Sequence, residues 1–453
     1  MGKKYDFDYI IIGSGPAGST AALSLSKSKK RIAIVEGGNF GGSNLNTRDI
    51  PYAISLNFSH LYSRFSSCPE INGRELHYNF PTVVAHQNYI TSTMGNQIKE
   101  DITSSGVTII DGFAHFIDTH TIAVNDKQYT SDNFIIATGA KNSTKGILGT
   151  DQVKCLTPDT IIKARRLPKF ILVVGGGSTG CEVAEYFAEL GVKVVILEKE
   201  SHLLPREDHE AGEALSEYLT RRLGVVVLTN ANVVAIQQDQ TSKIVIFKID
   251  NQEKNIRIDH IVLATGSEPN TDLGLENAQV KFSPQGVEVN RFFQTTAKNI
   301  FAIGDCIGGE SSTEKAEYQA SLLAANLINK AKNVINYNGF VRVTNTYPEV
   351  ASVGINEAEL SSKKRKYNTD IIYLKDLPIS KIHNLDYGFV KIITEHSGRV
   401  IGATIVSPNA GAMAEEISIV IRHNLNVIEL ASTPHIANSF SSAIRLTAKK
   451  LIR

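Results

Sequence analysis

The sequence has 453 residues, which is too long for one hydrophobic core and predicts two to four domains. Its 42% hydrophobic and 21% charged residues are typical of a globular protein, and its formal net charge of +1 gives no sign of a nucleic-acid partner. No apolar run approaches the roughly 20 residues of a membrane span, so we expect no membrane partner either.

The first residues run directly into an apolar strand at Tyr9–Ile12, so we expect no signal peptide. The cysteines are Cys68, Cys155, Cys181 and Cys306. They are widely scattered and have neither a metal-ligand spacing nor a disulfide spacing. We therefore predict no metal site, and a reducing, cytoplasmic location is the expectation.

A glycine-rich turn typical of a dinucleotide site follows this strand, with Gly13, Gly15 and Gly18 at GxGxxG spacing. The first glycine allows the tight turn, the second lets the backbone approach a pyrophosphate, and the third lets helix and sheet pack closely. The helix pattern that begins near Pro16 then directs free N–H groups at the phosphates. Glu36 ends the next strand, 18 residues after the last glycine, where its carboxylate can accept hydrogen bonds from ribose hydroxyls.

The same arrangement recurs in the segment 170–200. Gly175, Gly177 and Gly180 follow an apolar strand, and Glu198 again lies 18 residues after the last glycine. Two copies in one chain predict two dinucleotide sites rather than two chance glycine turns. The Glu198 carboxylate would repel a 2′-phosphate, which favours NADH over NADPH, although the basic residues at 199, 202 and 206 weaken this preference.

Three shorter segments end strands with polar residues. The segments 133–141 and 260–270 each end a strand in Ala-Thr-Gly, which fits the boundary of an inserted or appended nucleotide domain. In the segment 299–306, Asp305 follows a strand and could bind a polyol such as the ribityl chain of FAD. Taken singly, each of the three is equally compatible with an ordinary strand end.

Together these motifs resemble the pyridine nucleotide–disulfide oxidoreductases, a family that includes dihydrolipoamide dehydrogenase, mercuric reductase and soluble transhydrogenase. The resemblance runs through almost the whole chain in the family's order, including the C-terminal segments 346–360 and 398–421. It implies an α/β fold with two Rossmann-like domains, for FAD and NAD, and a C-terminal α+β interface domain that forms a homodimer. The implied boundaries are 1–145 and 271–335 for the FAD domain, 146–270 for the NAD domain and 336–453 for the dimerisation domain.

By this resemblance, most of the predicted site residues bind one of two cofactors. Those for FAD are Gly13, Gly15, Pro16, Ala17, Gly18, Glu36, Gly42, Ser43, Thr138, Gly139 and Asp305. Those for NAD(H), with NADP(H) less favoured, are Gly175, Gly177, Ser178, Thr179, Gly180, Glu182, Glu198 and Gly266. Ser178 replaces a bulky residue that often gates the nicotinamide pocket of the family, which predicts a pocket that is easier to enter.

The chain departs from the family at the redox-active cysteine pair. The family element Gly-Gly-x-Cys-x4-Cys-x-Pro-Ser-Lys aligns on residues 41–53, with Asn44 and Asp49 at the two cysteines and Ala53 at the lysine. Disulfide exchange needs a thiolate and a second sulfur. Reduction of lipoamide, glutathione disulfide or Hg(II) by the family route is therefore excluded. The catalytic candidates are therefore Asn44, Asp49 and Glu182. In the family, the counterpart of Glu182 pairs with that lysine.

Two interpretations of Asp49 are open. If Asp49 stacks near the isoalloxazine, it opposes negative charge on the flavin. At about 4 Å and an effective dielectric near 20 this term is at most about 4 kcal/mol, or about 90 mV for two electrons. Alternatively, Arg48 and Asp49 form an ion pair that only shapes the loop.

The family's C-terminal His-x4-Glu catalytic pair is also altered. Aligned without gaps, Ala437 falls on the histidine and Ser442 on the glutamate. His435 matches a histidine that often precedes the catalytic one. A shifted register makes His435 a candidate base, with Phe440 then in place of its carboxylate partner, whereas a structural role is the alternative.

The leading hypothesis is a homodimeric FAD enzyme that oxidises NADH and passes electrons directly to a diffusible, quinone-like acceptor. A soluble transhydrogenase is a close variant, and a non-catalytic flavoprotein is the competing class. Replacement of the lost pair by another cysteine is disfavoured, because Cys181 and Cys306 are expected to pack as small buried residues. Cys68 could approach the site only if the chain folded back on itself.

Overall fold

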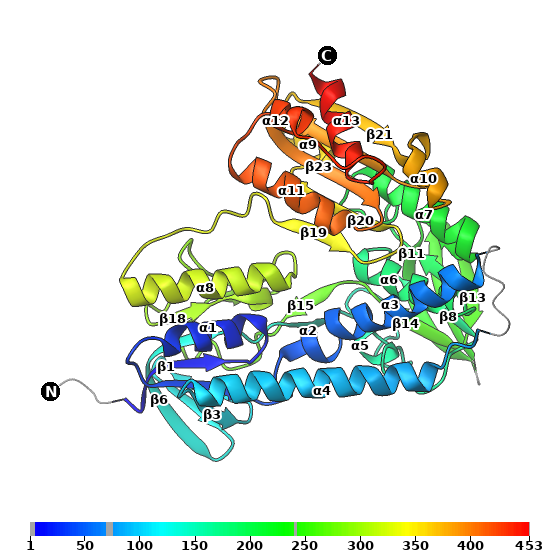
Figure 1. The fold of residues 1–453 in the computed structure, drawn as a ribbon. Helices are drawn as coiled ribbons and strands as arrows, with labels where there is room; N and C mark the ends of the chain where they lie inside the picture. The colour runs from blue at the N-terminus through cyan, green and yellow to red at the C-terminus, as the bar shows by residue number, and fades with distance from the viewer. Residues whose placement is uncertain (1–4, 69–75, 240–241, 453) are drawn as a thin grey trace. The chain divides into compact units, whose positions relative to one another are not determined.

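The computed structural model describes residues 5–68, 76–239 and 242–452, and the chain divides into two compact units (Figure 1). Unit 1 consists of Met1–Ile54, Pro81–Ser143 and Gly266–Asn336, and unit 2 consists of Ser55–Phe80, Thr144–Thr265 and Tyr337–Arg453. Each unit is described by itself below. The division into four segments made from the sequence stays a prediction.

Unit 1 is built on a sheet in the order β3-β2-β1-β6-β5-β4, with β18 paired to β6. Its strands are β1 (Phe7–Ile12), β2 (Ile32–Glu36), β3 (Thr108–Asp111), β4 (Ala114–Asp118), β5 (Thr121–Val124), β6 (Lys127–Ile136) and β18 (Ile300–Ala302). The strands β3, β2, β1, β6 and β18 are parallel, whereas β4, β5 and β6 form an antiparallel meander. Continuous apolar runs such as Ile10–Ile12 suit parallel strands, because these are buried on both faces.

Helices cover one face of this sheet. The helical elements outside the sheet include α1 (Pro16–Ser26), α2 (Gly42–Asn46), α4 (Phe80–Ser104), α8 (Thr313–Asn329) and the 3-10 turn η1 (Gly304–Ile307). The helices α1 and α8 pack against each other, and their alanine and leucine side chains form one core with Ile11 and Ile34 of the sheet. Small residues on α1 let this helix lie close to the strands. The helix α3 (Asp49–Ser66) begins in unit 1, and its residues from Ser55 onward belong to unit 2.

Short paired strands complete unit 1. They are β7 (Ala140–Asn142) with β15 (Ser267–Pro269), and β16 (Phe282–Ser283) with β17 (Gly286–Val287). The β7–β15 pair joins the two chain segments that leave the Ala-Thr-Gly motifs.

Unit 2 contains a second parallel sheet in the order β10-β9-β8-β14. Its elements are α5 (Pro158–Ile161), β8 (Phe170–Val174), α6 (Ser178–Glu189), β9 (Lys193–Leu197), α7 (His209–Leu223), β10 (Val226–Leu228), β14 (His260–Leu263) and the antiparallel strands β11 (Asn232–Asp239), β12 (Ser242–Ile249) and β13 (Gln252–Ile258). The helix α7 ends at Gly224, which adopts the left-handed conformation that favours glycine as a helix terminator. The succession strand, helix and strand matches the second predicted nucleotide motif.

The C-terminal part of unit 2 is a five-stranded antiparallel sheet in the order β19-β20-β23-β22-β21, packed against helices. Its elements are β19 (Val341–Thr344), β20 (Glu349–Gly354), α9 (Glu357–Ser362), β21 (Asn368–Tyr373), η2 (Leu374–Asp376), α10 (Pro378–Ile382), β22 (Phe389–Thr394), β23 (Val400–Ser407), α11 (Ala410–Arg422), α12 (Val427–Ser432) and α13 (Ser442–Leu451). All residues of β22 are buried, including Lys391.

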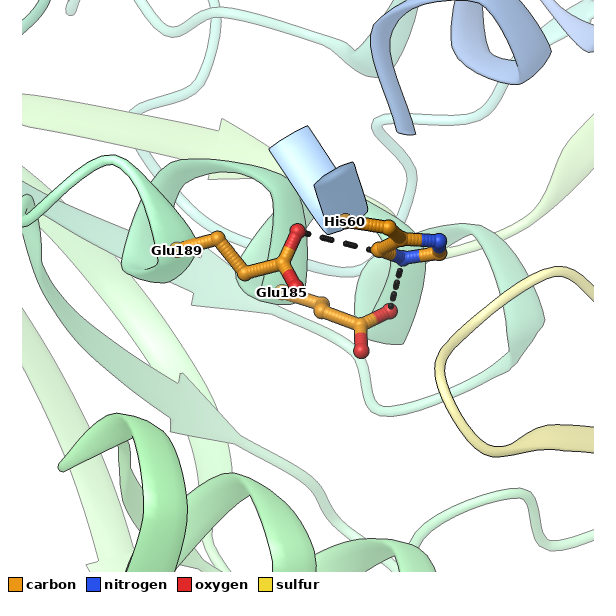
Figure 2. Close-up of side chains that lie close together, drawn as sticks. All are labelled: His60, Glu185 and Glu189. Atoms are coloured by element: carbon orange, nitrogen blue, oxygen red, sulfur yellow. Dashed lines mark ion pairs between the residues drawn. The ribbon is translucent and has the colours of Figure 1, made fainter. Parts of the chain in front are cut away.

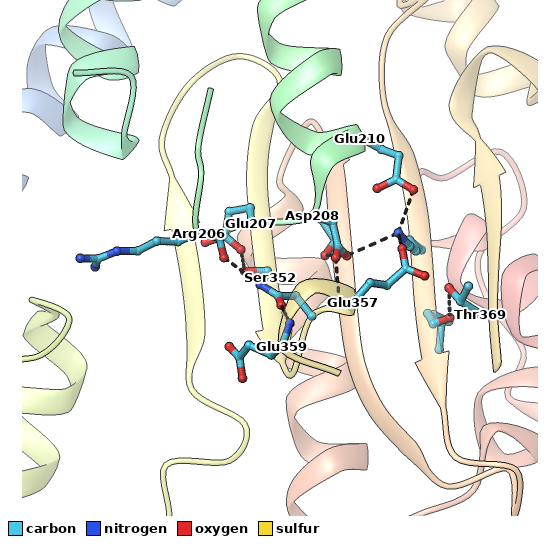
Figure 3. A network of polar contacts seen from close by, with 12 residues as sticks. Arg206, Glu207, Asp208, Glu210, Ser352, Glu357, Glu359 and Thr369 are labelled. Carbon is cyan, nitrogen blue, oxygen red and sulfur yellow. Dashed lines mark hydrogen bonds and ion pairs between the residues drawn. The ribbon is translucent and has the colours of Figure 1, made fainter. Parts of the chain in front are cut away.

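A polar network ties the start of α7 to this sheet (Figure 3). The Nζ atom of Lys391 donates to Glu210 at 2.8 Å and to Glu357, and it lies 3.7 Å from Asp208. Asp208 also accepts a hydrogen bond of 2.7 Å from Thr404. Because the Lys391 side chain is only 3% exposed, these carboxylates are its means of keeping a charge inside the protein.

The predicted class, α/β with two parallel nucleotide-type sheets and a C-terminal α+β part, is confirmed by this architecture. The predicted strand at Tyr9–Ile12 is longer by two residues, and the strand expected to end on Glu36 does so, spanning Ile32–Glu36. Within the described part of the chain, no helix combines the length and apolar character needed to cross a membrane.

Candidate functional site

The first glycine turn has the close contacts that its spacing predicts. Gly13 has a φ of 105°, a conformation that L side chains rarely adopt. A Cβ atom on Gly18 would lie 1.8 Å from the Gly13 carbonyl oxygen, so α1 can pack this close only without a side chain there. Gly15 is the N-cap of α1 and has no side chain to cap the first N–H groups of the helix. This arrangement fits the pyrophosphate of a dinucleotide.

The carboxylate of Glu36 is fixed beside this turn. Its Oε2 atom accepts hydrogen bonds from the backbone N–H (2.8 Å) and the hydroxyl (2.6 Å) of Ser14, and its Oε1 atom accepts from the Gly38 N–H at 2.7 Å. A carboxylate has about four acceptor sites, so capacity remains for a ribose hydroxyl. Ser14 is a residue of the site that the sequence analysis did not name.

The second glycine turn, in unit 2, repeats this geometry. Gly175 has a φ of 107°, and a Cβ atom on Gly180 would lie 2.0 Å from the Gly175 carbonyl oxygen. A Cβ atom on Gly177 would meet no protein atom within 4 Å, so the start of α6 is open. The Glu198 carboxylate accepts from the N–H groups of Gly176 (2.5 Å) and Glu200 (2.8 Å) and is 4% exposed.

The first Ala-Thr-Gly exit is hydrogen-bonded to Asn270, the last residue of the segment 260–270. The Thr138 hydroxyl donates to the Asn270 carbonyl at 2.7 Å, and the Asn270 side chain donates to the Thr138 carbonyl at 2.8 Å. The Asn270 N–H donates to the Gly139 carbonyl at 2.9 Å. Gly139 and Gly266 both have positive φ angles, of 67° and 105°. Asn270, a further residue that sequence reasoning missed, therefore ties the exit at Gly139 to the chain that follows Gly266.

Asn44 and Asp49 lie within hydrogen-bond distance of each other. The Nδ2 atom of Asn44 donates to Asp49 Oδ2 and to Thr313 Oγ1, each at 2.6 Å. The Thr313 hydroxyl, at the start of α8, donates to the same Asp49 oxygen at 2.8 Å. Three polar side chains therefore form a closed hydrogen-bonded group, and neither interpretation of Asp49 made from the sequence included Thr313.

Asp305 lies in the electrostatic reach of this group. Burial raises the pKa of its carboxyl, and the negative charge of Asp49 adds to the rise. The Ser311 hydroxyl and the positive charge of Arg48 oppose it. Asp305 is the second residue of η1, three residues after the end of β18, so it follows the strand as the sequence predicts. These residues form one polar region of unit 1.

Comparison with known proteins identifies the family. Residues 7–320 match the family described as pyridine nucleotide-disulphide oxidoreductase, and residues 340–448 match the dimerisation domain of the same family. The chain belongs to this family.

The relatives cover nearly the whole chain. The protein is 30% identical over 468 residues to a dihydrolipoyl dehydrogenase of Staphylococcus aureus, covering 98% of this chain and 96% of the relative. It is 28% identical over 435 residues to a mercuric reductase of Bacillus cereus, covering 95% of this chain and 69% of the relative. The crystal structure of LpdA from Mycobacterium tuberculosis has 26% identity and a TM-score of 0.87, covering 98% of this chain and 99% of that one.

Membership in the family decides the coarse chemistry. The protein is an oxidoreductase of a family that uses FAD and a nicotinamide nucleotide, and both glycine turns fit such cofactors. The dimerisation-domain match supports a homodimer. The preference for NADH over NADPH stays a prediction, as do the individual site residues.

In this chain Ala53 replaces the lysine of the family's lysine–glutamate pair, and the glutamate, Glu182, binds Asn345 instead. Glu182 is 8% exposed, and its Oε1 atom accepts hydrogen bonds from the N–H (2.8 Å) and the side-chain amide (3.0 Å) of Asn345. Ala53, at the lysine position, is exposed. The two donors from Asn345 therefore supply hydrogen bonds to the carboxylate in this family member.

His435 has a carboxylate neighbour, but from a helix that the sequence analysis did not consider. Its Nε2 atom lies 3.1 Å from Oε1 of Glu416 on α11, and its Nδ1 atom lies 3.1 Å from the Thr433 carbonyl. Phe440, the residue at the expected partner position, packs against His383 instead. The contacts of His435 suit either a base or a structural histidine.

The thiols of Cys155, Cys181 and Cys306 are not in disulfides. The Cys306 thiol donates to backbone carbonyls of Ile136 and Ile303, and burial raises its pKa to about 12. Burial also raises the pKa of Cys181 well above its usual range and raises that of Cys155. These three thiols are poor sources of a thiolate at neutral pH.

Proposed function

We propose that this protein oxidises NADH, in preference to NADPH, and passes the electrons from its flavin directly to a diffusible quinone-like acceptor without a disulfide step. When bound, FAD supplies a two-electron carrier and the nicotinamide nucleotide supplies a hydride. The contribution of the protein is to bind and orient the two cofactors. The proposed reaction keeps the FAD and nicotinamide chemistry that the family shares, and it omits the disulfide step.

The observation that carries the proposal is the Asn44–Asp49–Thr313 group. In the alignment, the amide of Asn44 and the carboxylate of Asp49 take the positions of the family's dithiol, and both are hydrogen-bonded to the Thr313 hydroxyl and to each other at 2.6–2.8 Å. None of these groups can accept two electrons as a disulfide does or form a mixed disulfide. The raised pKa values of Cys155, Cys181 and Cys306 argue against a substitute thiolate.

The first prediction concerns electron stoichiometry and thiol chemistry. Anaerobic titration of the holoenzyme with dithionite should consume two electrons per FAD, because no disulfide takes up a second pair. A family member with the cysteine pair should consume four under the same conditions. Stopped-flow mixing with NADH should bleach the flavin, and the turnover that follows with a quinone should be unaffected by arsenite, which blocks paired thiols.

The acceptor screen separates the alternatives. Turnover with lipoamide or glutathione disulfide, or uptake of four electrons, contradicts the proposal. Hydride exchange with thio-NAD that is faster than quinone reduction assigns the protein as a transhydrogenase. A flavin that stays oxidised under anaerobic NADH assigns it as a non-catalytic flavoprotein.

The second prediction concerns Asp49. Replacing Asp49 with asparagine removes a negative charge near the predicted flavin site and should raise the two-electron midpoint potential by tens of millivolts, with about 90 mV as the limit at 4 Å. The exposure of Asp49 reduces the effect through solvent screening. Potentiometric titration of the bound flavin measures it. The control is Asp126→Asn, an exposed carboxylate in the turn between β5 and β6, which should leave the potential unchanged. A zero shift in Asp49→Asn places Asp49 away from the isoalloxazine.

A further inference from the structure

A buried group of ligand-type side chains lies in unit 2 (Figure 2). His60 comes from α3, whereas Glu185 and Glu189 lie one turn apart on α6, so both carboxylates face the same side of that helix. The side chains of Glu185 and Glu189 are 0% and 1% exposed, and that of His60 is 19% exposed. Two carboxylates are therefore buried in a place where the sequence predicted no site.

The three side chains point ligand atoms at one another. The His60 Nε2 atom lies 3.4 Å from Glu185 Oε2 and 3.8 Å from Glu189 Oε2, and all the ligand atoms lie within 4.8 Å of one another. Among the described residues, none of these three atoms has a hydrogen-bond partner. Buried polar atoms are normally satisfied, because an unsatisfied one costs about 1–3 kcal/mol or more. Three in one place indicate a missing partner.

We propose that His60, Glu185 and Glu189 bind a divalent first-row transition-metal ion such as Zn²⁺ or Mn²⁺. An imidazole nitrogen with two carboxylate oxygens is a donor set that such ions accept. Bonds of about 2.0–2.2 Å in a tetrahedral site place ligand atoms about 3.3–3.6 Å apart, close to the observed 3.4 and 3.8 Å. Two ionised carboxylates balance the double positive charge of the ion.

Neighbouring groups hold the ligands in these orientations. The other oxygen of Glu185, Oε1, accepts a hydrogen bond of 2.8 Å from the Tyr347 N–H. The Tyr347 ring packs on the imidazole of His60 with ring centres 5.8 Å apart. The hydroxyls of Ser59 and Ser63 interact with Glu189. Such outer contacts are typical of metal ligands, because they leave one atom of each ligand aimed at the ion.

The surrounding charges are mixed. The charged or titratable groups that interact with these three residues include Arg64 on α3, Tyr78, Cys181 and Glu182 on α6, Tyr218 on α7 and Glu349 on β20. Arg64 opposes a cation, whereas Glu182 and Glu349 favour one. The Arg64 guanidinium lies over the Tyr347 ring, 5.3 Å from the centre.

Burial also shifts the ionisation of the three proposed ligands. Without an ion, burial raises the pKa of Glu185 well above its usual range and that of Glu189 to about 8. Burial lowers the pKa of His60, which leaves the imidazole neutral and ready to bind. A metal ion must displace the carboxyl protons, so its affinity should rise as the pH rises towards 8.

The test uses the full-length holoenzyme, stripped with EDTA and titrated with Zn²⁺ and with Mn²⁺ by calorimetry. We expect one ion per chain. Glu185→Gln and Glu189→Gln should each weaken binding by more than about 100-fold, since even outer partners contribute about 10- to 100-fold. The matched control is His209→Gln, because His209 forms an exposed pair with Glu213 at 3.0 Å. This control should bind as the parent does.

Two results overturn the proposal: no binding, or binding that survives both glutamate variants. The second of these marks an adventitious surface ion. Stoichiometry and affinity are measured on the unaltered protein, so absence of binding there overturns the proposal even if a variant does not fold. Flavin content and far-UV circular dichroism report whether the variants fold. The result is independent of the proposed electron acceptor, because binding is measured rather than turnover.

Discussion

Replacing Gly177 with alanine is expected to leave the fold and the bound flavin intact while weakening NADH binding by about 100-fold. Gly177 is the N-cap of α6 and has an ordinary extended backbone with a φ of −72°, so alanine adopts it without strain. A Cβ atom there would meet no protein atom within 4 Å. The protein itself loses nothing, but a pyrophosphate approaching the first N–H groups of α6 would meet the methyl group. Losing two hydrogen bonds to a charged group, at about 1.5–3 kcal/mol each, corresponds to at least about 100-fold.

The measurement is the dissociation constant of NADH, together with the KM in quinone turnover. Gly95→Ala is the control, because Gly95 lies inside α4, its Cβ would make only ordinary contacts, and no nucleotide approaches it in our assignment. Gly180→Ala is the opposite control: its Cβ would lie 2.0 Å from the Gly175 carbonyl, so unit 2 itself should be destabilised. If NADH binding is unchanged in Gly177→Ala, the pyrophosphate does not bind at this turn.

The nucleotide folds were predictable because their signals are local in the sequence. A buried strand, a glycine turn and a helix follow one another within about twenty residues, and the contact of Gly18 with Gly13 admits only glycine. The acid at the end of the following strand, such as Glu36, lies in a position that the sheet geometry fixes. The sequence pattern therefore contained most of the physical constraints of these two turns.

The polar contacts were not predictable because they join residues that are distant in the chain. Thr313 lies 264 residues from Asp49, and Asn345 lies 163 residues from Glu182. No periodicity relates such pairs, since they depend on how helices pack. The partner of His435 was not predictable for the same reason. The family spacing places the partner five residues further on, at Phe440, whereas the carboxylate that approaches His435 is Glu416 on α11.

The site at His60 shows this limit most clearly. On its own helix His60 resembles any other polar residue, and the two glutamates of α6 resemble a solvated face. What distinguishes the two glutamates is their burial beside His60, at 0% exposure for Glu185 and 1% for Glu189. Cysteine spacing, which predicted no metal site, carries no information about a site without sulfur.

Replacing Lys391 with methionine is expected to destabilise the C-terminal sheet of unit 2 by about 3–5 kcal/mol, because it leaves the buried carboxylate of Asp208 without its cation. The Asp208 side chain is 1% exposed and, among the described residues, would keep its hydrogen bonds from Thr404 and Glu357. Hydrogen exchange of the β22 and β23 amides measures the loss, as a fall in protection of about 150- to 5,000-fold. Local exchange is preferred to a global melting curve, since a protein with several domains and a cofactor does not unfold in two states.

The pH dependence of this loss follows from the shifted groups. Burial lowers the pKa of Lys391, but its hydrogen bonds to Glu210 and Glu357 outweigh burial and leave the pKa raised. The stabilisation from Lys391 is therefore complete below its unfolded pKa of about 10.5 and is lost as the pH rises through the folded value. Burial raises the pKa of Glu210, but the contacts with Lys391 lower it overall. The stabilisation from Glu210 is present above its unfolded value and is lost in acid. The difference between the parent and Lys391→Met should be largest between these limits.

Two further variants separate stranded charge from lost packing. Arg221→Met removes an exposed pair with Glu217 and should cost no more than about 0.5 kcal/mol. Adding Asp208→Asn to Lys391→Met removes one of the stranded charges and should restore part of the lost protection, because the amide can still accept from Thr404. If the double variant is no more stable than Lys391→Met, the packing of the lysine stem outweighs its charge, since neutralising Asp208 would relieve only an electrostatic loss.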